Sequence, residues 1–202
     1  MTQPETVPNH HAHHAPFTGV MGVVAALSMI TGRDEHAHLA IRLSELAPGD
    51  LVVDIGCGPG AAVRQAVRAG ARAIGVDPAP VMLRTARLLT RGDASYRTGV
   101  AEQLPVDDGA AQVAWSIATV HHWRDLDAGL REVRRVLAPG GRFVAIERRT
   151  HAGARGLAAH GWTDEQAARF AAQCEAQGFV GCGVEQHRGA RRSTLSVTAR
   201  TT

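Results

Sequence analysis

The sequence predicts an α/β fold, with a doubly wound and mostly parallel seven-stranded sheet, helices on both faces and an antiparallel C-terminal hairpin strand. Three observations predict it. Short apolar runs alternate with segments of helical periodicity between residues 51 and 146. A glycine-rich loop joins the first run to the helical segment that follows it. After residue 160 the pattern changes to one helix and two strand-like runs around a turn.

The N-terminal region is expected to have two parts. Residues 1–18 contain three prolines, little apolar content and histidines at positions 10, 11, 13 and 14, which predicts a flexible tail. No carboxylate or cysteine is spaced to join these histidines as a ligand, so no functional metal site is expected. Residues 19–47 are expected to form a helical cover over residues 48–202, the core of a single domain.

Within the predicted cover, the apolar stretch Val20–Ile30 has two interpretations. It is either a cover over a substrate or a core helix. Further along, Asp34 is predicted to cap a second helix, which Pro48 and Gly49 would end.

The core alternates between predicted strands and helices. The predicted strands are Leu51–Ile55, Ala73–Val76, Ser95–Thr98, Val113–Ile117 and Arg142–Ile146. The predicted helices run from Ala61 to Gly70, over Val81–Leu89 and over Asp125–Leu137. Strands that alternate with helices in this way form a parallel sheet covered by helices on both faces.

The C-terminal part has a different organisation. Thr163 and Gln166 form a capping box, which predicts a helix that continues to about Ala176. Val184–His187 and Leu195–Ala199 then lie on either side of a turn-like segment. A helix followed by a hairpin is expected to complete the sheet with antiparallel pairing.

Composition and charge limit the classes of function. The chain has 202 residues, enough for one domain, and 45% hydrophobic with 20% charged residues is typical of globular proteins. All 22 basic residues are arginines, which excludes a Schiff-base lysine and the lysine of a phosphate-binding loop. The net charge is only +3 and the arginines are spread among acids, so nucleic acid is not an expected partner.

The cysteines and the apolar segments bear on location. Cys57, Cys174 and Cys182 are odd in number and lack metal-ligand spacing, which is typical of a cytoplasmic protein. The apolar stretch near the N-terminus is shorter than the roughly 20 residues of a membrane span, and no basic segment of a signal peptide precedes it. The sequence leaves the oligomeric state open, with a homodimer as one option.

The strongest functional signal is the segment Val52–Gly60, which reads VVDIGCGPG. Gly56, Gly58 and Gly60 would allow a tight turn and bring main-chain N–H groups close to a ligand. The same loop satisfies the dinucleotide fingerprint, so a nicotinamide-dependent oxidoreductase is one alternative. Asp54 favours another ligand, because a carboxylate there would repel a pyrophosphate but attract ammonium and sulfonium groups.

With these residues the sequence resembles the class I S-adenosylmethionine-dependent methyltransferases, in particular the small-molecule enzymes similar to ubiquinone and menaquinone biosynthesis methyltransferases. Four motifs carry the resemblance. They are D-x-G-x-G-x-G at Asp54–Gly60, the acid Asp77 after the second strand, Gly99–Val106 in place of G-D-A-E-x-L-P-F, and Val133–Glu147 with its L-x-P-G-G signature. The resemblance implies a Rossmann-like fold, S-adenosyl-L-methionine as the cofactor and a small-molecule acceptor.

The resemblance also implies which residues bind the cofactor. They are Asp54, Gly56, Cys57, Gly58, Gly60, Asp77, Pro78, Met82, Ala101, Glu102 and Ser116. Asp77 would accept hydrogen bonds from both ribose hydroxyls. At one position the chain departs from the family, because Val100 replaces the aspartate that would bind the adenine amino group. Glu102 or backbone groups near Ala101 would have to substitute for it.

His121 and His122 are the candidate catalytic residues. They follow the fourth predicted strand, and acceptors are expected at the C-terminal ends of the strands. One of them would act as a general base, or both would only shape the pocket. Methyl transfer itself requires no metal. Because no base is certain and Val100 departs from the family, a noncatalytic module that binds S-adenosylmethionine is a second alternative.

Overall fold

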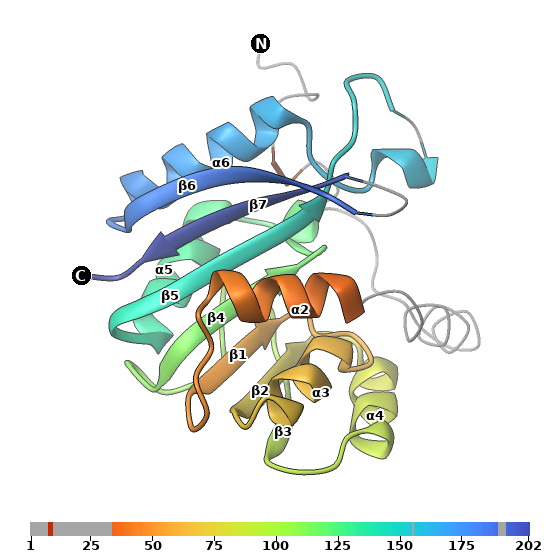
Figure 1. The fold of residues 1–202 in the computed structure, drawn as a ribbon, viewed down its shortest axis with the longest axis vertical. Coiled ribbons are helices and arrows are strands. Elements are labelled where there is room, and N and C mark those ends of the chain that lie inside the picture. Colours follow the sequence, from red (N-terminus) through yellow and green to blue (C-terminus); the bar gives the residue numbers. More distant parts are fainter. Residues whose placement is uncertain (1–7, 10–33, 155, 190–192) are drawn as a thin grey trace.

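Seven strands form one sheet in the computed structural model, which describes residues 8–9, 34–154, 156–189 and 193–202. The strand order is β3-β2-β1-β4-β5-β7-β6 (Figure 1). The strands are β1 (Leu51–Ile55), β2 (Arg72–Asp77), β3 (Ala94–Thr98), β4 (Ala111–Ile117), β5 (Leu137–Arg148), β6 (Val180–Arg188) and β7 (Ser193–Arg200). β1 to β5 pair in parallel, whereas β7 is antiparallel to both β5 and β6. The predicted sheet is therefore confirmed, including its C-terminal hairpin.

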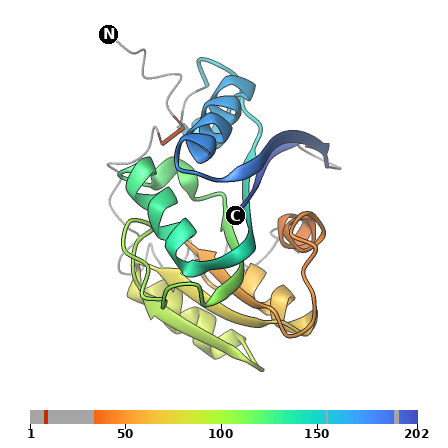
Figure 2. The ribbon, with the colours of Figure 1, turned by 90° about the vertical axis from the view of Figure 1, so that its left-hand side faces the viewer.

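Helices cover both faces of the sheet. They are α2 (Asp34–Leu43), α3 (Ala61–Arg68), α4 (Pro80–Leu89), α5 (Leu126–Val136) and α6 (Asp164–Ala176). Figures 1 and 2 show α5 and α6 on one side of the sheet and α2 on the other. Two separate hydrophobic clusters reflect this division, because α5 and α6 contribute to one and α2, α3 and α4 to the other. The fold is therefore doubly wound, as predicted.

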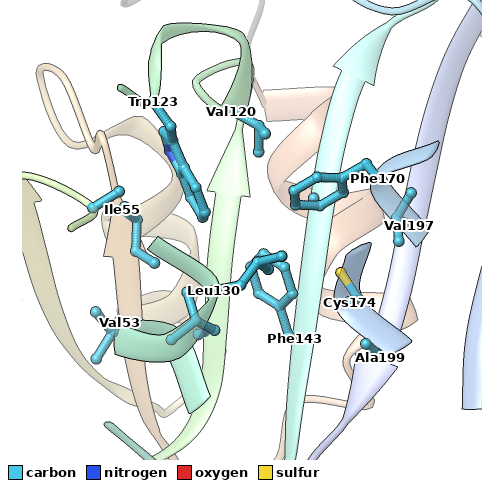
Figure 3. Close-up of a cluster of buried hydrophobic side chains, with 14 of the residues drawn as sticks. Val53, Ile55, Val120, Trp123, Leu130, Phe143, Phe170, Cys174, Val197 and Ala199 are labelled. Carbon is cyan, nitrogen blue, oxygen red and sulfur yellow. The ribbon is translucent and has the colours of Figure 1, made fainter. Parts of the chain in front are cut away.

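The larger cluster lies between the sheet and the pair α5 and α6 (Figure 3). Phe143 of β5 and Phe170 of α6 are fully buried there, with ring centroids 6.2 Å apart. Trp123, which precedes α5, lies 6.2 Å from the Phe170 ring and 6.5 Å from the Phe143 ring. These rings hold α5 and α6 against β4 and β5, and β4 leads into the segment that contains His121 and His122.

The chain direction of the sheet fixes where a ligand can bind. From β1 the chain continues outward to β2 and β3 and then returns to β4, which pairs with the other side of β1. The loops after β1 and β4 therefore diverge to opposite faces at a topological switch point. The crevice between such loops is the usual ligand site of an open α/β sheet.

Several element boundaries differ from the sequence prediction, among them the start of β6 at Val180 rather than Val184, and the structure gives a physical reason for two others. Helix α2 ends at Leu43, before Pro48, because Glu45 adopts a left-handed conformation with φ 49°. The amides of Glu45 and Leu46 then donate to the carbonyls of Arg42 and Ile41, as in a Schellman motif. At the other boundary, β5 begins at Leu137 rather than Arg142, because Leu137 pairs with Ala111 of β4 across a bulge.

Part of the N-terminal prediction lies outside the described residues, including the stretch Val20–Ile30. Pro8 and Asn9 are described, and both contact the domain. The carbonyl of Pro8 accepts a hydrogen bond from Trp162 Nε1 at 3.0 Å, and the side-chain amide of Asn9 donates to the Trp123 carbonyl at 3.0 Å. Among the described residues, no helix is both long and apolar enough to cross a membrane.

Candidate active site

The glycine loop between β1 and α3 has a backbone that other residues would adopt only with strain. Gly56, Gly58 and Gly60 have φ values of 74°, 52° and 78°. Space also limits the first position, because a Cβ on Gly56 would lie 2.5 Å from Cγ2 of Thr119. A Cβ on Gly60 would collide with the Tyr96 hydroxyl. At Gly56 and Gly60, conformation and packing therefore both require glycine. The amides of Gly56 and Cys57 donate to the Val76 carbonyl, which ties the loop to β2.

Asp77, at the end of β2, fixes the glycine loop. Its Oδ2 accepts a hydrogen bond from the Gly58 amide at 2.9 Å, and its Oδ1 accepts one from the Ala79 amide at 2.8 Å. The residue is buried, with 8% of its surface exposed. Because each carboxylate oxygen can accept more than one hydrogen bond, Asp77 can bind a hydroxyl-bearing ligand while it holds the loop.

Asp54 and Cys57 line a small hollow beneath the same loop, together with Gly56 and Ile117. Asp54 is 2% exposed, so a second carboxylate is buried at this end of the sheet. Burial raises the pKa of the Cys57 thiol well above its ordinary value, and the charges of Asp54 and Asp77 raise it further. Cys57 is therefore a neutral wall of the hollow, not a nucleophile. Buried carboxylates favour a cationic ligand, and the role of Asp54 in binding the donor stays a prediction.

The loop between β3 and β4 contains the predicted adenine-side residues. Ala101 is buried in the hydrophobic cluster under α5, and Val100 is 38% exposed. The Glu102 carboxylate accepts hydrogen bonds from the amides of Arg124 at 2.6 Å and Asp125 at 3.2 Å. Glu102 therefore links this loop to the segment before α5. Its contact with a cofactor remains a prediction.

The remaining predicted cofactor residues differ in exposure. Pro78 is exposed directly after Asp77, whereas Met82 is buried against Ala79 at the start of α4. Ser116 is fully buried near the end of β4. Its hydroxyl lies 2.7 Å from the hydroxyl of Thr119, which in turn donates to the Ile55 carbonyl at 2.9 Å. Ser116 therefore helps to fix the loop after β4 through its contact with Thr119.

Thr119 is a site residue that the sequence analysis did not identify. Its hydroxyl forms a hydrogen bond to Ile55 of β1, and its side chain packs directly against Gly56. The neighbouring Ala118 has a positive φ of 56°, which is rare for a residue with a side chain. Such strained residues often occur at functional sites, where they direct a loop. Here the turn directs the 3-10 helix η2 (Val120–His122) away from β4.

The geometry distinguishes the two predicted catalytic histidines. His121 is 3% exposed, and its Nδ1 lies 2.9 Å from each carboxylate oxygen of Glu147. Glu147 is buried near the end of β5 and was not predicted as a site residue, although it ends the Val133–Glu147 motif. A carboxylate can only accept, so Nδ1 of His121 carries the proton of this hydrogen bond. His122, in contrast, is exposed.

Residues 53–145 match a family described as methyltransferase domain. An uncharacterized methyltransferase of Synechocystis is 30% identical over 135 residues, which are 65% of this chain and 63% of that protein. The ubiquinone/menaquinone biosynthesis C-methyltransferase UbiE of Rubrivivax gelatinosus is 30% identical over 107 residues, 53% of this chain and 43% of that protein. The chain thus spans less than two thirds of these curated relatives.

A solved structure shares the fold. The S-adenosylmethionine-dependent methyltransferase of Aquifex aeolicus superimposes with a TM-score of 0.73. The match covers 89% of this chain and 98% of that protein, at 14% sequence identity.

Proposed function

The chain contains a class I S-adenosylmethionine-dependent methyltransferase domain, and on this premise we propose that it transfers the methyl group of S-adenosylmethionine to a small-molecule acceptor. The observation that carries the proposal is the glycine loop held between two buried carboxylates, Asp54 and Asp77. Their negative charge suits the ammonium and sulfonium groups of the donor, and it disfavours the pyrophosphate of a nicotinamide cofactor.

The residues around the loop fit this donor. Asp77 would accept hydrogen bonds from the ribose hydroxyls, and the loop Gly56–Gly60 would lie against the amino acid part. Backbone groups near Ala101 would meet the adenine edge, since Val100 offers no acceptor side chain there. When bound, S-adenosylmethionine supplies a methyl carbon activated by the adjacent sulfonium. The protein aligns the acceptor with it and excludes water.

His121 and Glu147 would manage the proton of the acceptor. The acceptor belongs beside the C-terminal ends of β1 and β4, where η2 places His121. Its Nε2 would take a proton from an O–H, N–H or S–H group as that atom attacks the methyl carbon. Glu147 would stabilise the imidazolium that forms, through the bond to Nδ1.

Several features support a small molecule as the acceptor. Only residues 149–163 separate β5 from α6, which leaves no room for an inserted domain that would bind a macromolecule. Several arginines make local contacts with acids, as in the bonds of Arg135 to Glu132 and Asp108. We also place the protein in the cytoplasm, because all three cysteines are free thiols.

A panel of ligands tests which class of cofactor the protein binds. S-adenosylmethionine and S-adenosylhomocysteine should raise the melting temperature, because binding to the folded state alone stabilises it, whereas NAD and NADP should not. Transfer of a labelled methyl group to a panel of hydroxyl, amino, thiol and carbon acceptors then separates an enzyme from a binding module. Stabilisation by a nicotinamide cofactor without any by the S-adenosyl ligands would overturn the proposal.

A further inference from the structure

Three histidine rings from two separate segments meet beside the C-terminal end of β4. His121 and His122 belong to η2, and His160 directly follows the 3-10 helix η3 (Gly156–Ala159). The ring centroid of His121 lies 4.1 Å from that of His122 and 5.4 Å from that of His160. The His122 and His160 centroids are 5.7 Å apart. Each ring can offer one nitrogen so that all three nitrogens lie within 4.8 Å of one another.

This spacing is close to that of a metal site. Zinc–nitrogen bonds of about 2.0–2.1 Å in tetrahedral geometry place ligand nitrogens roughly 3.4 Å apart. The three nitrogens therefore need to approach one another by about 1 Å or a little more, which is within the reach of side-chain rotation. His122 is exposed and His160 is half-buried, so these two rings can make that adjustment around the buried His121.

The environment of His121 gives a second, independent indication. Histidines that bind metals almost always donate their other ring N–H to a carboxylate, a carbonyl or water, which fixes the ring and raises its basicity. The Nδ1 of His121 lies 2.9 Å from both oxygens of the fully buried Glu147 carboxylate. The buried negative charge also favours a cation beside the ring.

We propose that His121, His122 and His160 bind one divalent transition-metal ion of the zinc type. Three imidazole nitrogens suit Zn²⁺ or Co²⁺, whereas Mg²⁺ and Ca²⁺ prefer oxygen ligands. Three protein ligands would also leave a fourth tetrahedral position for water or another small ligand.

Metal binding has a consequence that rests on the proposed function. The bond to Glu147 occupies Nδ1 of His121, so Nε2 is the atom that the ring offers to a metal. The proposed base uses the same lone pair. A bound ion and a base at His121 therefore exclude each other, and Zn²⁺ should inhibit the transfer to acceptors that need deprotonation by this residue.

The test must separate this site from the histidines of the N-terminal segment. The background protein is the full chain with His10→Gln, His11→Gln, His13→Gln and His14→Gln. Co²⁺ binding to this protein is measured from the visible absorption of the bound ion. Zn²⁺ binding is measured by competition with Co²⁺ and by calorimetry. In this background, His160→Gln removes a proposed ligand and His151→Gln is its control. His151 is an exposed histidine of the same segment between β5 and α6, and it lies outside the cluster.

The background protein should bind one equivalent of Co²⁺ with the intense spectrum of a tetrahedral ion. His160→Gln should weaken binding at least about tenfold because a ligand is lost, while His151→Gln should leave it unchanged. Glu147→Gln should weaken it by about 10- to 100-fold, as is typical when the carboxylate behind a metal-bound histidine is removed. Because His122 is exposed, His122→Gln provides a ligand variant that is expected to fold normally.

Two results would overturn the site. One is equal metal affinity of His160→Gln, His122→Gln and His151→Gln in the folded background protein. The other is a loss of all binding when the four N-terminal histidines are replaced. Calorimetry with S-adenosylhomocysteine on the same samples keeps the two proposals apart. Metal binding without donor binding would refute the methyltransferase alone, and the reverse would refute the metal site alone.

Discussion

Asp77 uses both oxygens of its carboxylate within the protein, and the proposed donor would share them. Asp77→Ala should weaken the binding of S-adenosylhomocysteine by more than about tenfold, because charge-assisted hydrogen bonds contribute roughly 1.5 to 3 kcal/mol each. Part of the loss should come from the glycine loop, since the Gly58 amide loses its acceptor. Asp77→Asn, which keeps one acceptor oxygen, should lose less affinity.

Calorimetry measures these affinities. Asp93→Ala is the control, because Asp93 is an exposed aspartate between α4 and β3, remote from the glycine loop. Unchanged affinity in Asp77→Ala, with the protein folded, would remove Asp77 from the donor site.

The buried pair of His121 and Glu147 predicts that substitutions of these residues lower kcat and leave donor affinity nearly unchanged. If His121 is the base, His121→Ala should lower kcat by about 10²- to 10⁴-fold with donor affinity nearly intact. Glu147 acts through His121 as a positioning residue. Glu147→Gln should therefore also lower kcat, by about tenfold or more, and Glu147→Asp should restore part of it.

Steady-state kinetics with an identified acceptor checks this prediction, with His151→Ala as the control. If the histidines only shape the pocket, the KM for the acceptor will rise while kcat stays near that of the unmodified protein. Near-normal kcat in both His121→Ala and Glu147→Gln would leave alignment as the source of catalysis.

Single residues were predictable from sequence where a local motif contains them. The loop glycines and Asp77 follow their strands at fixed spacing, so the pattern alone placed them at one edge of the sheet. Glu147, Thr119 and His160 could not be found in this way. Glu147 meets His121 only because β4 and β5 pair in register and end together, and no local pattern records that contact.

At the scale of elements, α5 holds the loop between β3 and β4 through two charged side chains. Glu132 accepts a hydrogen bond from the Leu104 amide at 2.8 Å, and Arg135 donates to the carbonyls of Leu104 and Val106. The guanidinium of Arg135 holds the pKa of Glu132 below its ordinary value of 4.5. The predicted adenine side of the donor site therefore depends on a contact between elements.

This contact predicts sensitivity to acid. Because the folded-state pKa of Glu132 is lowered, its contribution to stability is present above about pH 4.5 and is lost as the pH falls through the folded value. Glu132→Gln should make the free energy of unfolding less dependent on pH below 4.5. Arg135→Ala should lower that free energy by about 1 to 3 kcal/mol and weaken donor binding.

Urea unfolding between pH 3 and 7 measures both effects. Arg131→Ala serves as the control, because Arg131 is an exposed arginine of the same helix. An identical acid dependence in Glu132→Gln and the unmodified protein would contradict the assignment.

Most elements were predictable because their end signals are local. The capping box of Thr163 and Gln166 is present at the start of α6, and Gly70 ends α3 with a positive φ of 86°. The end of α2 was not predictable, since Glu45 takes the left-handed position that glycine usually occupies. The early start of β5 depends on pairing with β4, which local patterns do not contain.

At the scale of the whole molecule, the alternation of strands and helices and the glycine loop predicted the fold class. Right-handed crossovers with helices on both faces of a sheet leave few possible strand orders. They did not predict how distant segments meet. The hydrogen bond between Trp162 and Pro8 is an example, since it joins residues that are 154 positions apart in the sequence.

The absence of lysine makes the response of the whole protein to alkali unusually simple. Between about pH 9 and pH 11 the side chains that titrate are the three cysteines and the single tyrosine, because arginine stays charged. Burial raises the pKa of Cys57 and of Cys174 above the ordinary 9.0, and it raises the pKa of Tyr96 to about 12. The folded state therefore keeps protons that the unfolded chain releases.

The free energy of unfolding should consequently fall as the pH rises above about 9. In that range the unfolded state binds fewer protons, so each buried thiol contributes a slope that approaches about 1.4 kcal/mol per pH unit, and Tyr96 adds to it above pH 10. The double variant Cys57→Ala and Cys174→Ala should lose most of the slope between pH 9 and 10. Cys182→Ala should change it less, because Cys182 is only partly buried. Urea unfolding from pH 7.5 to 11 measures the slopes, and an equal slope in the double variant would show that other groups govern the alkaline transition.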